Sequence, residues 1–258
     1  MSPKFISTSA ILIWLAASGS FANAQGSGAN AMRCTSCFRG LPAVLEEVPG
    51  SVPLKKTLKS DLYYTDSTGT VWKANTGDVT DGASIPDVFV PLVGDRFEPD
   101  FLPAAIIHDH YTNDDHKVRP WTDTARVFYQ AMVTNQTPVS KAKVMYYAVY
   151  VFGPHWGQLK PGQFCGDHCI NIAPHEYAIE SDGSDKKLEA LAPPVGGGLF
   201  YVEPPHANAS DVPELADVKK MVEAAEVSGN PMSLGELERQ ATIRHPEKIF
   251  LAIAAQAK

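Results

Sequence analysis

The sequence is short of positive charge. Its 258 residues include 22 lysines and arginines against 29 aspartates and glutamates, which gives a net charge of −7. The basic residues are scattered, and no basic run is interleaved with aromatic residues. Nucleic-acid binding depends on such runs, because phosphate contacts supply most of the affinity. The sequence therefore predicts no nucleic-acid partner, and an anionic lipid surface is also a poor electrostatic match.

The chain also lacks an apolar run of the roughly 20 residues that a membrane-spanning helix needs. The shorter run Ile6–Ala17 follows Lys4 and precedes Ala22-Asn23-Ala24. A charged start, an apolar centre and small residues at the cleavage site are typical of a secretory signal peptide. We therefore expect cleavage between Ala24 and Gln25, a secreted or periplasmic mature chain, and no transmembrane anchor in it.

Cysteine is scarce, and the four present are Cys34, Cys37, Cys165 and Cys169. In an exported chain an even number predicts disulfides, and four cysteines allow three pairings. We favour two bridges that join the N-terminal arm to the segment after Gly153. A zinc site that includes His168 is the less favoured alternative. A redox role for the first pair is weaker still, because no strand–helix pattern surrounds it.

Several hydrolase motifs are absent as well. No His-Glu-x-x-His zinc-peptidase pattern occurs. His108 is the first histidine of the chain, so a His-Asp phosphohydrolase, which needs another histidine upstream, is excluded. The segment Gly82–Pro86 is not a nucleophile elbow, and Ser84 is therefore a weak candidate for a nucleophile.

The densest set of chemically capable groups lies in the stretch from Thr80 to Tyr111. A helix starting near Pro103 would place His108 on a small and apolar face. A buried imidazole without a partner costs about 1–3 kcal/mol, so His108 needs an acceptor or a metal. Asp109 lies about 100° further round the helix, toward a cleft rim or the Asp81 loop.

The fold expected from these patterns is α+β: a small antiparallel sheet or hairpin packed on a three-helix unit, with a C-terminal helical extension. Leu62–Thr65 and Thr70–Lys73, joined by a turn, predict the hairpin. Periodicity and capping residues predict six helices, over residues 103–112, 123–134, 138–153, 212–227, 233–243 and 246–258.

The predicted organisation has a main α+β domain at its centre. The full set of ranges is 1–24 for the signal peptide, 25–51 for an arm without its own core, 52–158 for the main domain, 159–180 for a cysteine-containing segment, 181–210 for a linker and 211–258 for the helical extension.

Residues 54–156 resemble a bacterial and phage family, domain of unknown function 1353. The resemblance is carried by Thr80–Pro86, by Ala104-Ala105-x-x-His108-Asp109, by Phe128-x-x-Ala131-Met132 and by Met145–Trp156. The sequence departs from the family pattern at His110, and at Ala125, where the family has an aspartate for which Asp123 is a nearby substitute. The family has no settled activity, so the resemblance implies a fold unit and a site rather than a reaction.

Two functional hypotheses follow. In the first, the protein is a hydrolase with His108 as general base, while Asp81 and Asp109 orient the ring or hold a divalent cation such as calcium. Supporting residues would be Ser84, Tyr111 and Asp123. The helical His-Asp pair is similar to that of secreted phospholipases A2. In the second, the protein is a non-catalytic binding or structural module, and its C-terminal helices recruit a protein partner.

Overall fold

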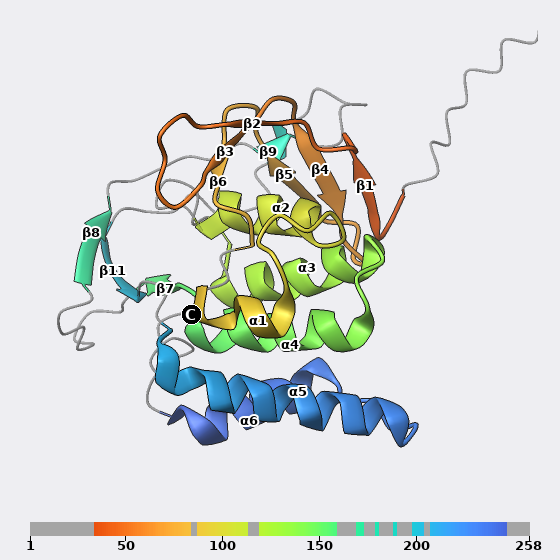
Figure 1. Cartoon of the computed structure of the whole chain (residues 1–258). Helices are drawn as coiled ribbons and strands as arrows, with labels where there is room; N and C mark the ends of the chain where they lie inside the picture. Colours follow the sequence, from red (N-terminus) through yellow and green to blue (C-terminus); the bar gives the residue numbers. More distant parts are fainter. Residues whose placement is uncertain are drawn as a thin grey trace, which may run out of the picture. The chain divides into compact units, whose positions relative to one another are not determined.

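The computed structural model describes residues 34–83, 87–112, 119–158, 169–172, 179–180, 188–189, 198–203 and 207–246. Within these residues the protein is an α+β fold of small antiparallel sheets and helices, as the sequence predicts. The helices α2, α3 and α4 lie between the two N-terminal sheets and the C-terminal pair α5 and α6 (Figure 1).

The first sheet has the strand order β1-β4-β5, with β1 at Cys37–Arg39, β4 at Leu62–Thr65 and β5 at Val71–Ala74. Its β4–β5 hairpin confirms the prediction. The connecting turn is organised by Asp66, whose carboxylate accepts hydrogen bonds from the backbone of Thr68 and from the indole of Trp72. An aspartate that bonds the backbone two residues ahead favours a turn at this point.

The second sheet has the order β2-β3-β6, with β2 at Leu45–Glu47, β3 at Lys56–Leu58 and β6 at Val79–Thr80. The extended piece before Asp81, strand β6, therefore lies at the edge of this sheet. Strands β1 and β2, in contrast, lie inside the range 25–51, where composition indicated no ordered core. Each has three residues and pairs with a strand elsewhere in the chain, so no local pattern predicts it.

Asp61 precedes β4 and provides a test of the first sheet. Partial burial opposes a low pKa, but hydrogen bonds from the N–H and hydroxyl of Thr76 and from Lys73 outweigh it and lower the pKa of Asp61 to about 2. Because this lies below the unfolded value of about 3.9, the stabilisation is complete above about pH 4 and is lost as the pH falls toward 2. In Asp61→Asn, the free energy of unfolding measured by urea titration should therefore fall less steeply between about pH 4 and pH 2 than in the unmodified protein. The same pH dependence of the free energy of unfolding in the two proteins would contradict this.

The three central helices are α2 at Leu102–Thr112, α3 at Trp121–Thr134 and α4 at Val139–Phe152. All three were predicted, but α3 begins two residues early, after Pro120, and neither Thr122 nor Asp123 caps it. The short helical segments Asp87–Phe89 and Val90–Val93 (α1) were not predicted. Every residue of α4 from Ala142 to Phe152 is buried, which requires cover on all sides.

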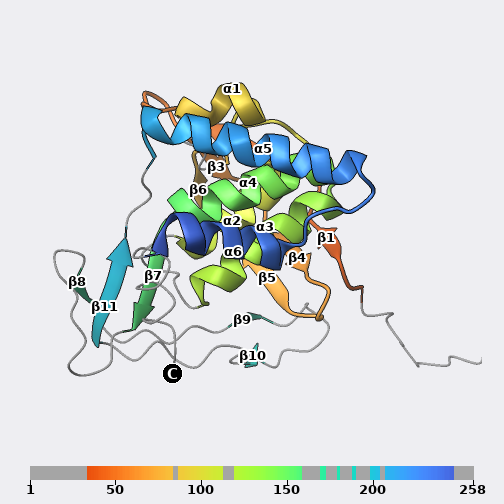
Figure 2. The ribbon, with the colours of Figure 1, turned by 90° about the horizontal axis from the view of Figure 1, so that it is seen from below.

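That cover includes the C-terminal helices α5, Val212–Val227, and α6, Leu234–Arg244, which both contact α4 (Figure 2). Both helices were predicted. Ser233 caps α6 by accepting the N–H of Glu236, which is one half of the expected capping box. The Glu236 side chain instead bonds Arg239 and Gln240. The helix expected over 246–258 lies outside the described residues, apart from Pro246.

Further strands occur between α4 and α5. Strand β7, His155–Gln158, and strand β8, Cys169–Ile172, flank β11, Gly198–Glu203, in an antiparallel sheet. A two-stranded pair joins β9, Ile179–Glu180, to β10, Leu188–Glu189. Two of these strands, β10 and β11, fall in the range 181–210, which the sequence predicts to be a linker.

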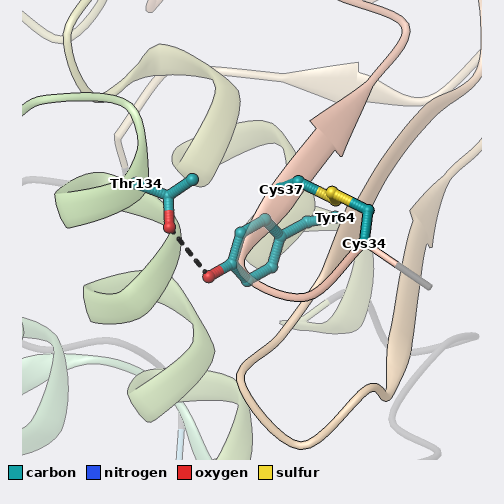
Figure 3. The surroundings of a disulfide bond; sticks show 4 residues. All are labelled: Cys34, Cys37, Tyr64 and Thr134. Atoms are coloured by element: carbon teal, nitrogen blue, oxygen red, sulfur yellow. Dashed lines mark hydrogen bonds between the residues drawn. A yellow bond between two sulfur atoms is a disulfide. The ribbon is translucent and has the colours of Figure 1, made fainter. Parts of the chain in front are cut away.

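The cysteine pairing differs from the one favoured above. Cys34 and Cys37 are bonded to each other, with their Cα atoms 6.1 Å apart (Figure 3). Ser36, between them, has a φ of 55° and turns the chain so that the two side chains meet. A bridge from either residue to the segment after Gly153 is therefore wrong. Cys165 and the side chain of Cys169 lie outside what the structure describes.

Candidate functional site

Helix α2 carries three consecutive polar residues, His108, Asp109 and His110, in an otherwise apolar sequence. Successive residues of a helix point about 100° apart, so the three side chains leave α2 in different directions. His108 reaches α3, Asp109 reaches Thr80 at the end of β6, and His110 reaches the residue before β6. The geometry therefore defines three separate environments rather than one cluster.

The His108 side chain is almost completely buried, with 3% of the residue exposed. Its ring centroid lies 5.1 Å from that of Phe128 on α3. Its Nδ1 atom lies 3.9 Å from the Oδ1 atom of Asp109, which is beyond the range of a direct hydrogen bond. Among the described residues, none makes a hydrogen bond to this imidazole.

The other three histidines that the structure describes are different. His110 lies 2.7 Å from a carboxylate oxygen of Asp78, His155 lies 2.8 Å from the carbonyl of Tyr150, and His245 lies 2.9 Å from Glu214. Each has the close acceptor that a structural core histidine needs. His108 lacks one, although it is the residue that the sequence selects as the functional candidate.

Asp109 is held by a residue that sequence analysis missed. The hydroxyl of Thr80 donates to Oδ2 of Asp109 at 2.5 Å, and the Thr80 hydroxyl oxygen itself accepts the N–H of Gly82 at 3.0 Å. The only available signal is strand alternation, since Val79 is exposed and Thr80 therefore points inward. Thr80, rather than Asp81, joins the loop to α2.

Replacing Thr80 by valine keeps the shape of the side chain and removes the hydroxyl. Since Asp109 would lose a bond to a charged group, we expect the free energy of unfolding to fall by about 1.5–3 kcal/mol. Thr242→Val is a matched control, because Thr242 is exposed and its hydroxyl returns to its own helix. Chemical denaturation of both variants tests this, and equal losses would contradict the assigned role of Thr80.

The Asp81 carboxylate lies beside Arg96, not beside His108. The closest atoms of Asp81 and Arg96 are 3.9 Å apart, and the Asp81 side chain is 33% exposed. The loop is fixed here because Ala83 donates to the carbonyl of Arg96. Gly82 has a φ of 89°, and a Cβ at that position would lie 2.5 Å from the same carbonyl oxygen. Only glycine fits this approach.

Of the three predicted supporting residues, the structure describes Tyr111 and Asp123. Tyr111 accepts the N–H of Lys73 on β5 and packs its ring on Trp72, so it stabilises the sheet. Asp123 is exposed on the first turn of α3. Ser84 lies outside the described residues.

The predicted calcium site does not fit the residues that the structure describes. Within them, no group of three or more His, Cys, Asp or Glu side chains could hold a metal ion. Asp81 and Asp109, the expected ligands, contact Arg96 and Thr80, and the guanidinium beside Asp81 already brings positive charge. We therefore assign no metal-dependent step to this site.

Comparison with known proteins shows the family to which the sequence belongs. Residues 56–149 match the family described as "Protein of unknown function (DUF1353)". The uncharacterized protein y4iH of Sinorhizobium fredii (strain NBRC 101917 / NGR234) is 37% identical over 215 residues, which cover 83% of this chain and 80% of y4iH. The chain therefore belongs to this family, as its motifs indicate.

A second relative shares a smaller part. The uncharacterized protein y4jT of the same strain is 40% identical over 124 residues, 45% of this chain and 36% of y4jT. No solved structure matches. In the part of the chain searched, no helix has both the length and the apolar character needed to cross a membrane.

Proposed function

We propose that the protein is a hydrolase in which His108 is the general base and Asp109 is the carboxylate that supports it. The observation that carries this proposal is that no described residue makes a hydrogen bond to the imidazole of His108. Its imidazole is buried, has no hydrogen bond from the described residues, and lies 3.9 Å from a carboxylate. Most buried histidines have a hydrogen-bond partner, so a histidine that the described residues leave without one favours a functional explanation.

The chemistry follows from the positions of the atoms. An imidazole nitrogen without a protein partner is available to take a proton from water or from a substrate hydroxyl. The ring then becomes positively charged, and the nearby Asp109 carboxylate stabilises that charge, more strongly in a buried site than in water. Thr80 holds the carboxylate in one orientation, so little reorganisation is needed during the reaction.

A second candidate is the non-catalytic module. Two contacts favour it: Thr80 with Asp109, and Asp78 with His110. Both connect α2 to the end of the second sheet, so two of the three polar residues of α2 have a structural role. This candidate leaves the missing partner of His108 without an explanation, and for that reason the hydrolase is preferred.

We also propose that the protein is exported. The support is the charged, apolar and small-residue pattern of residues 1–24 and the bond between Cys34 and Cys37, which an oxidising compartment favours. Expression of the full gene in a Gram-negative host should yield periplasmic protein whose mass corresponds to a start at Gln25. Full-length cytoplasmic protein would exclude export.

The purified protein can then be screened against chromogenic carboxylic esters, phosphodiesters, glycosides and peptides, with and without a chelator. The proposal expects turnover of one class that His108→Gln abolishes and that the chelator leaves unchanged. Turnover that the variant retains would show that another group is responsible. Absence of turnover across all four classes, in folded protein, would favour the module.

A further inference from the structure

The bond between Cys34 and Cys37 joins residues only three positions apart, at the N-terminal end of β1. A disulfide stabilises a fold mainly by restricting the unfolded chain, and the effect grows with the length of chain that it closes. A closure this short restricts very little. The bond also connects no distant parts of the molecule, so stabilisation alone is a poor reason for it.

Strand β1 is held in place by other contacts. It pairs with β4 at three positions, from Cys37 opposite Thr65 to Arg39 opposite Tyr63. The ring of Phe38 lies 4.8 Å from that of Tyr64, which is fully buried and whose hydroxyl lies 3.1 Å from that of Thr134 on α3 (Figure 3). These contacts do not involve sulfur, so β1 can keep its register when the bond opens.

The two sulfur-bearing residues differ in accessibility. Cys34 is exposed, whereas Cys37 is partly buried in the strand. Thiol–disulfide exchange requires a thiolate to reach one sulfur of the bond, and exposed disulfides are the ones that exchange readily. The structure therefore directs the attacking thiolate to Cys34 and makes Cys37 the leaving group.

We propose that Cys34 and Cys37 form a thiol-exchange site that takes two electrons from a dithiol. A thiolate of the dithiol attacks Sγ of Cys34, and the electron pair of the broken bond leaves on Sγ of Cys37, which takes up a proton. The second thiol of the partner loses its proton and attacks the partner's sulfur atom in the mixed disulfide. This step releases the Cys34 thiolate, which takes up a proton. The protein ends as a dithiol and the partner as a disulfide, so atoms and electrons balance.

The test treats the folded full chain with dithiothreitol in buffer without denaturant, followed by alkylation and mass spectrometry of the peptide that holds both cysteines. The expected result is two labels on this peptide with an unchanged circular dichroism spectrum, and no labels on a sample that is reoxidised before alkylation. The proposal is overturned if labelling requires denaturant, if it accompanies loss of structure, or if peptide mapping joins Cys34 or Cys37 to Cys165 or Cys169.

Single variants test the direction of attack. In Cys37→Ser the remaining Cys34 thiol should react with oxidised glutathione about tenfold faster than the Cys37 thiol does in Cys34→Ser, because of its greater access. Equal rates, or a faster Cys37, would overturn the assigned order of attack. The dithiothreitol experiment on the unmodified chain does not depend on whether either variant folds.

Discussion

Replacing His108 by glutamine is expected to lower the rate of the proposed hydrolysis by about 10²–10⁴-fold, the usual contribution of a general base, while the protein stays folded. Glutamine retains polarity and nearly the volume of the ring beside Phe128, so little packing is lost. Asp109 keeps its hydrogen bond from Thr80, so no carboxylate is left without a partner. The thermal midpoint should shift by only a few degrees.

The neighbouring histidine provides a matched control. His110 is on the same helix and similarly buried, but it has a direct partner, since its Nδ1 atom lies 2.7 Å from Asp78. His110→Gln should lower the free energy of unfolding by about 1–3 kcal/mol, because it disrupts a buried bond to a carboxylate. It should leave turnover per folded molecule unchanged.

The two variants therefore separate the hypotheses. The hydrolase expects loss of activity in His108→Gln and loss of stability in His110→Gln, measured by initial rates and by urea denaturation of both proteins. If His108→Gln loses as much stability as His110→Gln and keeps its rate, the His108 imidazole is structural and the hydrolase proposal is wrong.

Replacing Leu215 on α5 or Leu237 on α6 by alanine should each lower the free energy of unfolding by about 2–5 kcal/mol. Both side chains are completely buried and belong to the same core as α4. Because α4 is buried on all sides from Ala142 to Phe152, loss of packing from its C-terminal cover leaves a cavity that the remaining helices cannot fill. Calorimetry or urea denaturation measures the loss.

Polar contacts reinforce this interface. Tyr146 and Tyr147 on α4 donate hydrogen bonds to Glu238 and Glu214, and Arg126 binds Glu238 with two further bonds. Burial, followed by the adjacent glutamates, raises the pKa values of both tyrosines well above the usual value. Both hydroxyls therefore keep their protons and remain donors throughout the physiological pH range.

Val227→Ala is the control on the same helix, because Val227 is 89% exposed and its loss should change stability by no more than about 0.5 kcal/mol. Separate unfolding transitions for the C-terminal helices, with Leu215→Ala affecting only one of them, would contradict a shared core. That result would instead support the predicted boundary near residue 211, which so far remains a prediction.

The sequence-based predictions were accurate for elements that depend on interactions between residues close together in the chain. The β4–β5 hairpin depends on a turn at Asp66, and α2, α4, α5 and α6 depend on apolar spacing and on residues such as Ser233, all of which are local. Strands β1 and β2 were missed because each has only three residues, too few to show strand alternation, and β1 also pairs with a strand far along the chain. The contact between Arg96 and Asp81 likewise has no local signature, because it joins two separate segments of the chain.

The sequence by itself determined the α+β class, most of the helices, the family and the choice of His108 and Asp109 as candidates, because local periodicity and short motifs encode these features. Only the tertiary structure decided which groups meet. Thr80 reaches Asp109 across 29 residues and Asp78 reaches His110 across 32, and no described residue offers His108 a close acceptor. Such contacts depend on how the second sheet packs against α2, and a one-residue change of strand register would point Thr80 to the opposite face.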